Sequence, residues 1–201
     1  LGGLRIDPKT NIGSRVTYYN NVKIRNLKNQ KSEITQVKGL PKNPKLSNIS
    51  WSPDQKRIAL TNTTETGVEL WVLELENGSV TKLTESNLNS NIGSVINWFS
   101  DSENMLVKMI PNNRRPLIDT NKIVPDGPTI STNFGEKAQN RTYQDLLKNK
   151  FDEHNFEQLS TSTIYKVSID GSVKKWMDDG MYRTISFSPN GEYVSATSYS
   201  A

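Results

Sequence analysis

The sequence predicts an all-β chain built from a repeated antiparallel unit, and two observations carry this prediction. First, a short motif occurs three times: Ile-Ser-Trp-Ser-Pro-Asp at 49–54, Ile-Asn-Trp-Phe-Ser-Asp-Ser at 96–102, and Ile-Ser-Phe-Ser-Pro-Asn-Gly at 185–191. Second, each copy closes a run of alternating apolar residues with an aromatic residue and a turn. A unit that recurs in this way buries its apolar face against its neighbours, as repeat proteins do.

The best-defined unit lies in residues 46–91. Its pattern predicts four strands separated by turn residues, at 48–52, 57–62, 68–75 and 79–83. Four short strands in a meander, with turns about every ten residues, predict one blade of a β-propeller. The predicted fold class is therefore all-β, a partial β-propeller made of antiparallel four-stranded blades.

Other segments repeat parts of this blade and suggest how the chain is divided. Residues 22–27 and 33–37 resemble its last two strands, and so do 163–169 and 173–176. We expect a partial first blade at 1–45, a full blade at 46–91, a blade with an insertion at 92–180, and the first strands of a truncated blade at 181–201. The motif aromatics are about 47 and then about 89 residues apart. One blade with an insertion and two irregular blades both fit the longer interval.

The alternation stops between Pro111 and Ser160, which predicts one long insertion at about 111–159, between the second and third strands of its blade. Helical spacing of Tyr143, Leu146, Leu147 and Phe151 predicts a short amphipathic helix at 141–151 that packs on the blade or on a partner domain. A long loop of this kind is either functional or disordered, and the sequence leaves both open.

Composition excludes several classes of function. The chain has 201 residues, 33% hydrophobic residues, no cysteine and a net charge of +4. No apolar stretch approaches the roughly 18 residues that span a bilayer, so we expect no membrane insertion. The absence of cysteine excludes disulfides, thiolate metal sites and a cysteine nucleophile. The mild positive charge comes without an aromatic platform or helix-turn-helix pattern, so nucleic acid is not an expected partner.

Motifs for catalysis, cofactors and metals are missing from the sequence. His154 is the single histidine, and its surroundings (Asp-Glu-His-Asn at 152–155) lack a zinc-binding pattern, so we interpret it as a surface residue. No G-x-S-x-G elbow, Walker loop or dinucleotide-binding glycine motif occurs. The Asp-Gly pairs at 170–171 and 179–180 lack the further carboxylates of a calcium loop. We therefore expect no catalytic residue, no cofactor and no metal site in this chain.

Several segments resemble the amino-terminal propeller of prolyl oligopeptidase family serine peptidases. Within that family the chain is most similar to the glutamyl endopeptidase branch of bacteria and plant chloroplasts. The more specific segments are Leu-Arg-Ile-Asp-Pro at 4–8 and Arg-Thr-Tyr-Gln-Asp-Leu-Leu at 141–147. Trp-Ser-Pro-Asp at 51–54 and Glu-Leu-Trp-Val at 69–72 are shared by many propellers. The resemblance covers most of the chain, in order.

This resemblance implies a two-domain enzyme in which a propeller of seven or eight blades covers a carboxy-terminal α/β-hydrolase domain. That domain would be the partner of this chain within one polypeptide and would carry the catalytic serine, aspartate and histidine. None of the three maps onto this sequence. The implied role of the chain is to restrict the access of peptide substrates to a serine peptidase, one that cleaves after glutamate if the branch resemblance holds.

Recognition of glutamate would need a cation, and arginine binds a carboxylate through two parallel hydrogen bonds. Arg114 and Arg115, beside Pro116 at the start of the insertion, are the candidates for substrate binding. The other interpretation of the pair is a solvated loop.

Two other classes of function remain open at this stage. One is a non-enzymatic propeller that binds a peptide, glycan or protein partner. The other is a periplasmic accessory protein of the translocation-associated propeller type, against which the insertion with its helix argues. The Asn- and Lys-rich composition and the branch resemblance suggest a bacterial cell envelope protein, periplasmic or secreted, with a cytoplasmic location as the alternative.

Overall fold

The computed structural model describes residues 2–28, 33–119, 122, 127, 135 and 147–199. Within these residues the elements in chain order are β1 (Ile6–Asp7), β2 (Ile12–Gly13), β3 (Lys23–Ile24), β4 (Thr35–Gln36), β5 (Leu46–Trp51), β6 (Arg57–Thr63), β7 (Val68–Glu74), β8 (Ser79–Lys82), β9 (Ile96–Trp98), β10 (Asn104–Met109), α1 (Lys150–Ser160), β11 (Ser162–Ser168), β12 (Val173–Phe187) and β13 (Val194–Tyr199).

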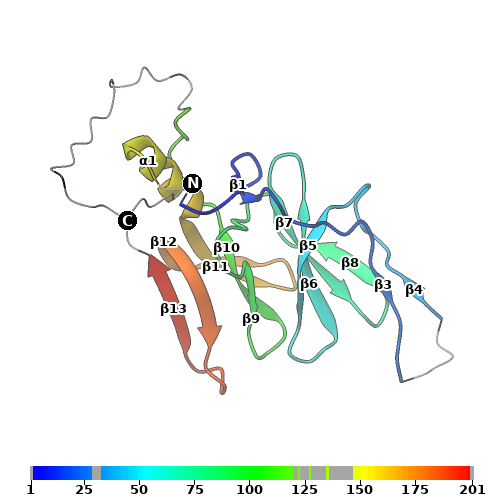
Figure 1. The fold of residues 1–201 in the computed structure, drawn as a ribbon. Coiled ribbons are helices and arrows are strands. Elements are labelled where there is room, and N and C mark those ends of the chain that lie inside the picture. Colours follow the sequence, from blue (N-terminus) through cyan, green and yellow to red (C-terminus); the bar gives the residue numbers. More distant parts are fainter. Residues whose placement is uncertain are drawn as a thin grey trace.

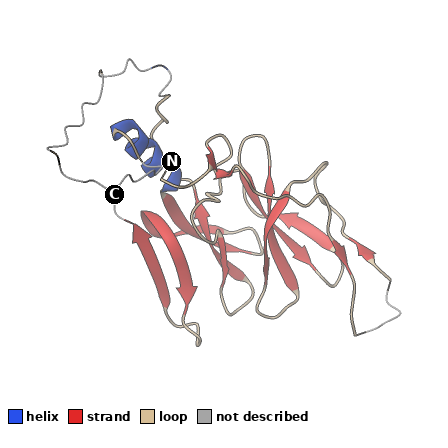
Figure 2. Ribbon diagram, viewed as in Figure 1, coloured by secondary structure: helices blue, strands red, loops and turns tan. Residues whose placement is uncertain are grey.

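The strands form antiparallel sheets that stand side by side (Figures 1 and 2). One sheet has the order β5-β6-β7-β8, and the other has the order β13-β12-β11-β10-β9. Strands β1 and β2 form a small hairpin, and so do β3 and β4. This arrangement confirms the predicted fold class, a partial β-propeller with one long insertion that contains a short helix.

Apolar residues fill the spaces between neighbouring sheets. On β6, Ala59 lies in the cluster shared with β9 and β10, whereas Leu60 lies in the cluster that reaches the β3–β4 hairpin. On β10, Val107 lies in the former cluster and Leu106 packs toward β12 and β13. Successive residues of a strand point to opposite faces, so both faces of each central strand are buried, which explains its nearly continuous apolar sequence.

The three copies of the sequence motif form the same turn. In each copy a backbone N–H donates to the carbonyl three residues earlier, and the donor residue has a left-handed φ. The donors and acceptors are Gln55 to Ser52 (2.9 Å, φ 59°), Ser102 to Phe99 (3.2 Å, φ 59°) and Gly191 to Ser188 (2.9 Å, φ 74°). Glycine adopts this conformation without steric cost, and the third copy alone has a glycine there.

An asparagine or aspartate side chain closes each of these turns. In the first copy, Asp54 Oδ1 accepts hydrogen bonds from Ser52 Oγ (2.6 Å) and from the Lys56 N–H (3.0 Å). In the third copy, Asn190 Oδ1 accepts from Ser188 Oγ at 2.6 Å. The Asp54 N–H also donates to Ser102 Oγ at 2.9 Å, so the first and second turns are joined. We call this side of the molecule the turn end.

The insertion leaves the sheet at the opposite end. Strand β10 stops at Met109 and β11 starts at Ser162, and these two strands pair directly with each other. The insertion thus connects neighbouring strands, and its helix α1 lies at what we call the α1 end, away from the turns (Figure 1).

Among the described residues, the predicted helix at 141–151 overlaps the observed helix only at Lys150 and Phe151. Residues 141–146 lie outside the described residues, and 147–149 precede the helix, which occupies Lys150–Ser160. The physical reason is the cap: the Asn149 side chain accepts the N–H groups of Phe151 and Asp152 and starts the helix there.

The other strand predictions differ in length. Strands β3 and β4 are two residues each, shorter than the predicted 22–27 and 33–37. The boundary predicted at residue 180 falls inside β12, which pairs with β11 through its first half and with β13 through its second half. The division of the chain into blades stays a prediction.

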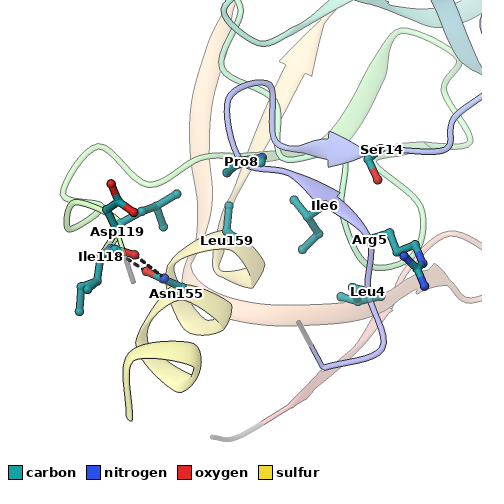
Figure 3. Close-up of a pocket in the computed structure, with 10 residues that line it drawn as sticks. Leu4, Arg5, Ile6, Pro8, Ser14, Ile118, Asp119, Asn155 and Leu159 are labelled. Atoms are coloured by element: carbon teal, nitrogen blue, oxygen red, sulfur yellow. Dashed lines mark hydrogen bonds between the residues drawn. The ribbon is translucent and has the colours of Figure 1, made fainter. Parts of the chain in front are cut away.

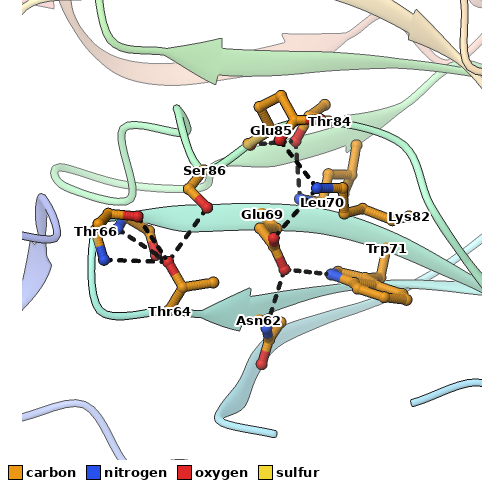
Figure 4. A network of polar contacts seen from close by, with 11 residues as sticks. Asn62, Thr64, Thr66, Glu69, Leu70, Trp71, Lys82, Thr84, Glu85 and Ser86 are labelled. Atoms are coloured by element: carbon orange, nitrogen blue, oxygen red, sulfur yellow. Dashed lines mark hydrogen bonds and ion pairs between the residues drawn. The ribbon is translucent and has the colours of Figure 1, made fainter. Parts of the chain in front are cut away.

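A polar cluster on the β5–β8 sheet surrounds Glu69 (Figure 4). This carboxylate is 9% exposed and accepts from Asn62 Nδ2 (3.0 Å), Trp71 Nε1 (2.9 Å) and Lys82 Nζ (3.4 Å). Burial alone would raise the pKa of Glu69, but the hydrogen bonds from Asn62 and Trp71 and the charge of Lys82 outweigh it and lower the pKa. The cluster joins three strands and stabilises the sheet.

Candidate functional site

Polar side chains and pockets gather at the α1 end. Helix α1, the amino-terminal segment, residues 111–119, the middle of β12 and the end of β13 meet there (Figure 1). The helix begins at the Asn149 cap, and Asp152 and Glu153 in its first turn complement the partial positive charge of a helix amino terminus. It ends at Thr161, whose N–H and hydroxyl both donate to the Glu157 carbonyl.

The buried face of α1 is polar, and it binds the backbone of residues 115–118. Asn155 accepts the N–H of Ile118 and donates to its carbonyl, both at 2.8 Å. Gln158 Oε1 accepts the Arg115 N–H at 2.9 Å, and His154 Nε2 lies 3.0 Å from the Pro116 carbonyl. These contacts hold the segment that carries Arg114 and Arg115 against the helix.

Three asparagines join the helix to the rest of the chain through one carbonyl. Asn11 Nδ2 (3.3 Å), Asn89 Nδ2 (3.1 Å) and Asn91 Nδ2 (3.3 Å) all donate to the Leu159 carbonyl. Asn89 Nδ2 also donates to the Thr161 carbonyl at 2.8 Å. We call these three residues the asparagine cluster. It fixes the end of α1 to the amino-terminal segment and to the loop between β8 and β9.

A buried lysine binds the backbone of the same loop. Lys108 on β10 is 1% exposed, and its Nζ donates to the Asn91 carbonyl at 2.5 Å and to the Ile92 carbonyl. The described residues offer it no carboxylate within ion-pair distance. Burial lowers the pKa of Lys108 from its ordinary 10.5 to about 8.

One pocket lies between the amino-terminal segment, residues 117–119 and α1. It has a volume of about 530 Å³. Figure 3 shows its lining residues, with Asn155 and Ile118 joined by their two hydrogen bonds at one side and Leu4, Ile6 and Pro8 on the other. It therefore lies on the side of α1 that the asparagine cluster and the segment 115–118 hold in place.

A second pocket contains both predicted arginines, and we call it the arginine pocket. It measures about 550 Å³ and combines residues from the insertion, the end of α1 and β12–β13. Its charged lining residues are Arg114, Arg115, Glu157 and Asp179. The structure thus brings Arg114 and Arg115 to one concave site, although the sequence alone cannot say which other segments border it.

The two arginines differ in how their charges are balanced. Arg115 is 62% exposed and its guanidinium pairs with Glu157 Oε2 at 3.0 Å. Arg114 is half-buried, and among the described residues its guanidinium donates only to the neutral Asn11 Oδ1, at 3.0 Å. Burial lowers the pKa of Arg114, which still leaves the group cationic at neutral pH. Asp179, across the pocket, already accepts the Thr163 hydroxyl at 2.5 Å.

An arginine that is partly desolvated and lacks an acidic partner attracts an anion more strongly than an exposed, paired one. The arginine pocket can therefore accept a carboxylate at Arg114. His154 is bound to the Pro116 carbonyl and lies outside this pocket's lining. Within the described residues, His, Asp and Glu side chains form no group of three or more that could hold a metal ion. No described helix is long and apolar enough to cross a membrane.

Sequence reasoning missed the residues that build this end of the molecule. Asn11, Asn89 and Asn91 lie in segments with no strand or helix pattern, and the sequence contains many other asparagines. Gln158 and Asn155 are buried polar residues on a helix, where an apolar stripe would be the usual signal. These five residues differ from the other polar residues of the chain only in their hydrogen-bond partners, which lie far away in the sequence.

Repeated antiparallel sheets packed face to face, with a polar insertion at one end, define this chain as part of a β-propeller. No family model matches it. It is 30% identical over 210 residues to a probable chloroplastic glutamyl endopeptidase of Oryza sativa subsp. japonica, and 30% identical over 214 residues to the protein of the same description from Arabidopsis thaliana. Each alignment covers 98% of this chain and 22% of the relative.

These comparisons confirm the resemblance to the glutamyl endopeptidase branch of prolyl oligopeptidase family serine peptidases. The chain is a peptidase-associated region that spans about a fifth of the length of these relatives. Two solved acylaminoacyl peptidases are also similar. One, in complex with Z-Gly-Gly-Phe-chloromethyl ketone, is 20% identical with a TM-score of 0.42 over 86% of this chain and 22% of its own. The other, from Pyrococcus horikoshii, is 19% identical with a TM-score of 0.33 over 80% and 28%.

The expectation about location is wrong. The two curated relatives are plant proteins described as chloroplastic, which contradicts a bacterial cell envelope, periplasmic or secreted protein. Composition misled here because an Asn- and Lys-rich chain is not specific to one compartment.

Proposed function

We propose that this chain is the propeller part of a larger serine peptidase and that it controls the access of peptides to a catalytic domain in the same polypeptide. The relatives support this proposal, because they are named as glutamyl endopeptidases and are several times longer than this chain. In this role the sheets form a wall, and the α1 end presents a concave polar surface to a peptide.

One observation carries the more specific part of the proposal. Arg114 is a half-buried cation that lines a pocket of about 550 Å³ and has no acidic partner among the described residues. Its guanidinium binds the carboxylate of a glutamate in the substrate. Arg115 stands beside it and contributes positive charge, which Glu157 partly neutralises. Both arginines thus take part in recognition, Arg114 directly and Arg115 more weakly.

The test uses the full-length protein and two matched peptides that differ only in glutamate or glutamine before the cleaved bond. We expect wild type to prefer glutamate, and Arg114→Ala to lower the ratio of kcat/KM values, glutamate over glutamine, at least tenfold. That change corresponds to about 1.4 kcal/mol, within the range of a charge-assisted hydrogen bond. Arg115→Ala is the matched control and should change the ratio less.

A fluorophosphonate probe reports independently on the serine peptidase. Labelling of the full-length protein at one serine supports the enzyme, and absence of labelling in a folded protein leaves the alternative of a non-enzymatic binding propeller. If the glutamate preference is the same in wild type, Arg114→Ala, Arg115→Ala and the double variant, neither arginine recognises the substrate.

A further inference from the structure

A third pocket adjoins the arginine pocket, and its lining is mainly apolar. It measures about 650 Å³. We call it the apolar pocket. Its apolar lining residues come from four separate parts of the chain: Leu4, Ile92, Leu147, Phe156, Met181 and Tyr199. A volume of this size takes a leucine or phenylalanine side chain together with part of its backbone.

The apolar pocket and the arginine pocket share two lining residues. Met181 at the middle of β12 and Tyr199 at the end of β13 line both of them. The two residues are paired across the strands, so this shared wall is part of the sheet and not a loop. The Arg183 guanidinium lies 5.7 Å from the Tyr199 ring centroid and holds the ring by a cation–π contact. A bound peptide can therefore reach both pockets with neighbouring side chains.

Another part of the lining is made by a residue in an unfavourable backbone conformation. Ile92 has a φ of 50°, which is rare for a β-branched residue. The Lys108 ammonium holds its carbonyl, and Gly93 packs so tightly that a Cβ there would lie 1.9 Å from the Arg183 carbonyl oxygen. Backbone strain of this kind is found where a residue must be presented to a ligand.

We propose that the apolar pocket binds an apolar side chain of the peptide whose glutamate lies at Arg114. The proposal rests on the proposed function and adds a second determinant of specificity, an apolar residue next to the acidic one. Charge supports this occupant in two ways: Arg114 in the adjoining pocket has no acidic partner among the described residues and attracts a glutamate, whereas the Glu153 carboxylate that lines the apolar pocket disfavours a second acidic side chain there.

The test measures kcat/KM of the full-length protein on peptides in which glutamate is fixed and each neighbouring residue is alanine, leucine or phenylalanine in turn. We expect leucine or phenylalanine at one position to raise kcat/KM about tenfold or more over alanine, because a single methylene group in an apolar pocket already changes kcat/KM about tenfold or more. No apolar preference at any position would overturn the proposal. It would mean that another segment of the same polypeptide fills the pocket.

Two variants locate the effect. Leu147→Ser should lower the leucine-to-alanine ratio severalfold. The matched variant Leu117→Ser, which changes a lining residue of the pocket of about 530 Å³ and not of the apolar pocket, should leave the ratio unchanged. Ile92→Asn removes apolar wall while keeping a residue that tolerates a left-handed φ, so it should fold and also lower the ratio. An unchanged ratio in both Leu147→Ser and Ile92→Asn would refute the pocket.

Failure of the apolar-pocket proposal can be distinguished from failure of the proposed function. If Arg114→Ala leaves the glutamate preference intact while Leu147→Ser lowers the leucine preference, the arginine assignment fails and the apolar pocket stands. If the full-length protein cleaves none of the peptides, binding of the same fluorescently labelled peptides, compared between leucine and alanine and between wild type and Leu147→Ser, decides on the pocket alone.

Discussion

The two ends of the sheets are held together in different ways. At the turn end, the side-chain hydrogen bonds of Asp54 and Asn190 join residues two positions apart, and the same geometry recurs along the chain. At the α1 end, the asparagine cluster binds the Leu159 carbonyl from positions 68, 70 and 148 residues away.

The contacts at the turn end can be encoded by a short stretch of sequence, whereas those at the α1 end form only in the complete fold. Turns made from local contacts form wherever the motif occurs. The α1 end exists only after three distant segments have met, so its stability depends on a few long-range polar contacts. It is also the end with the candidate site, which fits a region of lower local stability.

The largest expected effect concerns Lys108, which supports the loop at the α1 end. Its pKa is about 8 in the folded protein and 10.5 ordinarily, so between these values the unfolded chain binds the proton more tightly. Stability therefore rises with pH across this window, by up to roughly 3 kcal/mol. Below about pH 8, Lys108 is protonated in both the folded and the unfolded protein, so the free-energy cost of burying its charge is fully present.

Lys108→Met removes the titrating group and should remove this rise. Urea unfolding of the full-length protein, followed by tryptophan fluorescence from pH 7 to 10.5, compares the variant with wild type. Lys56→Met, which makes the same change at an exposed lysine, is the control. Equal pH dependence in wild type and Lys108→Met would show that Lys108 is not a buried cation.

A smaller effect is expected when the asparagine cluster is broken. Asn89→Ala removes donors to the Leu159 and Thr161 carbonyls, at a cost of about 1–3 kcal/mol. We expect faster hydrogen exchange of the α1 amides with little change at the turn end. Asn97→Ala is the matched control, because the buried Asn97 Nδ2 has no hydrogen-bond partner in the part of the chain that the structure describes, and its loss should be neutral or stabilising. If α1 exchanges as in wild type after Asn89→Ala, the cluster does not hold the helix.

The smallest effect is expected at the turn end, where the copies can be exchanged. Gln55→Gly places glycine at a left-handed position and should stabilise by about 0.5–1 kcal/mol, whereas Gly191→Ala should destabilise by about 1 kcal/mol. Urea midpoints of the full-length variants measure both. If both variants changed the free energy of unfolding in the same direction, the two turns would not share one geometry. If either variant altered the hydrogen exchange of the α1 amides, the two ends would not be independent.

The same contrast explains which features were predictable. The strands at 57–63 and 68–74 follow from short segments rich in apolar residues between turn residues, and the structure places them within one residue of the predicted limits. The helix was misplaced because apolar spacing suggested 141–151, while the Asn149 cap and a polar buried face define Lys150–Ser160. Arg114 and Arg115 are proposed from their chemistry alone. Their different surroundings depend on Asn11 and Glu157, which no local pattern connects to them.

Strand β12 has a mechanical consequence. It runs from Val173 to Phe187 without a break and is hydrogen-bonded to β11 in its first half and to β13 in its second. Met181, where the strand passes from one partner to the other, lines both the arginine pocket and the apolar pocket. A ligand that displaces Met181 therefore strains the hydrogen bonds of β12 to β11 and to β13 together. No loop separates the two halves of the strand to absorb the movement.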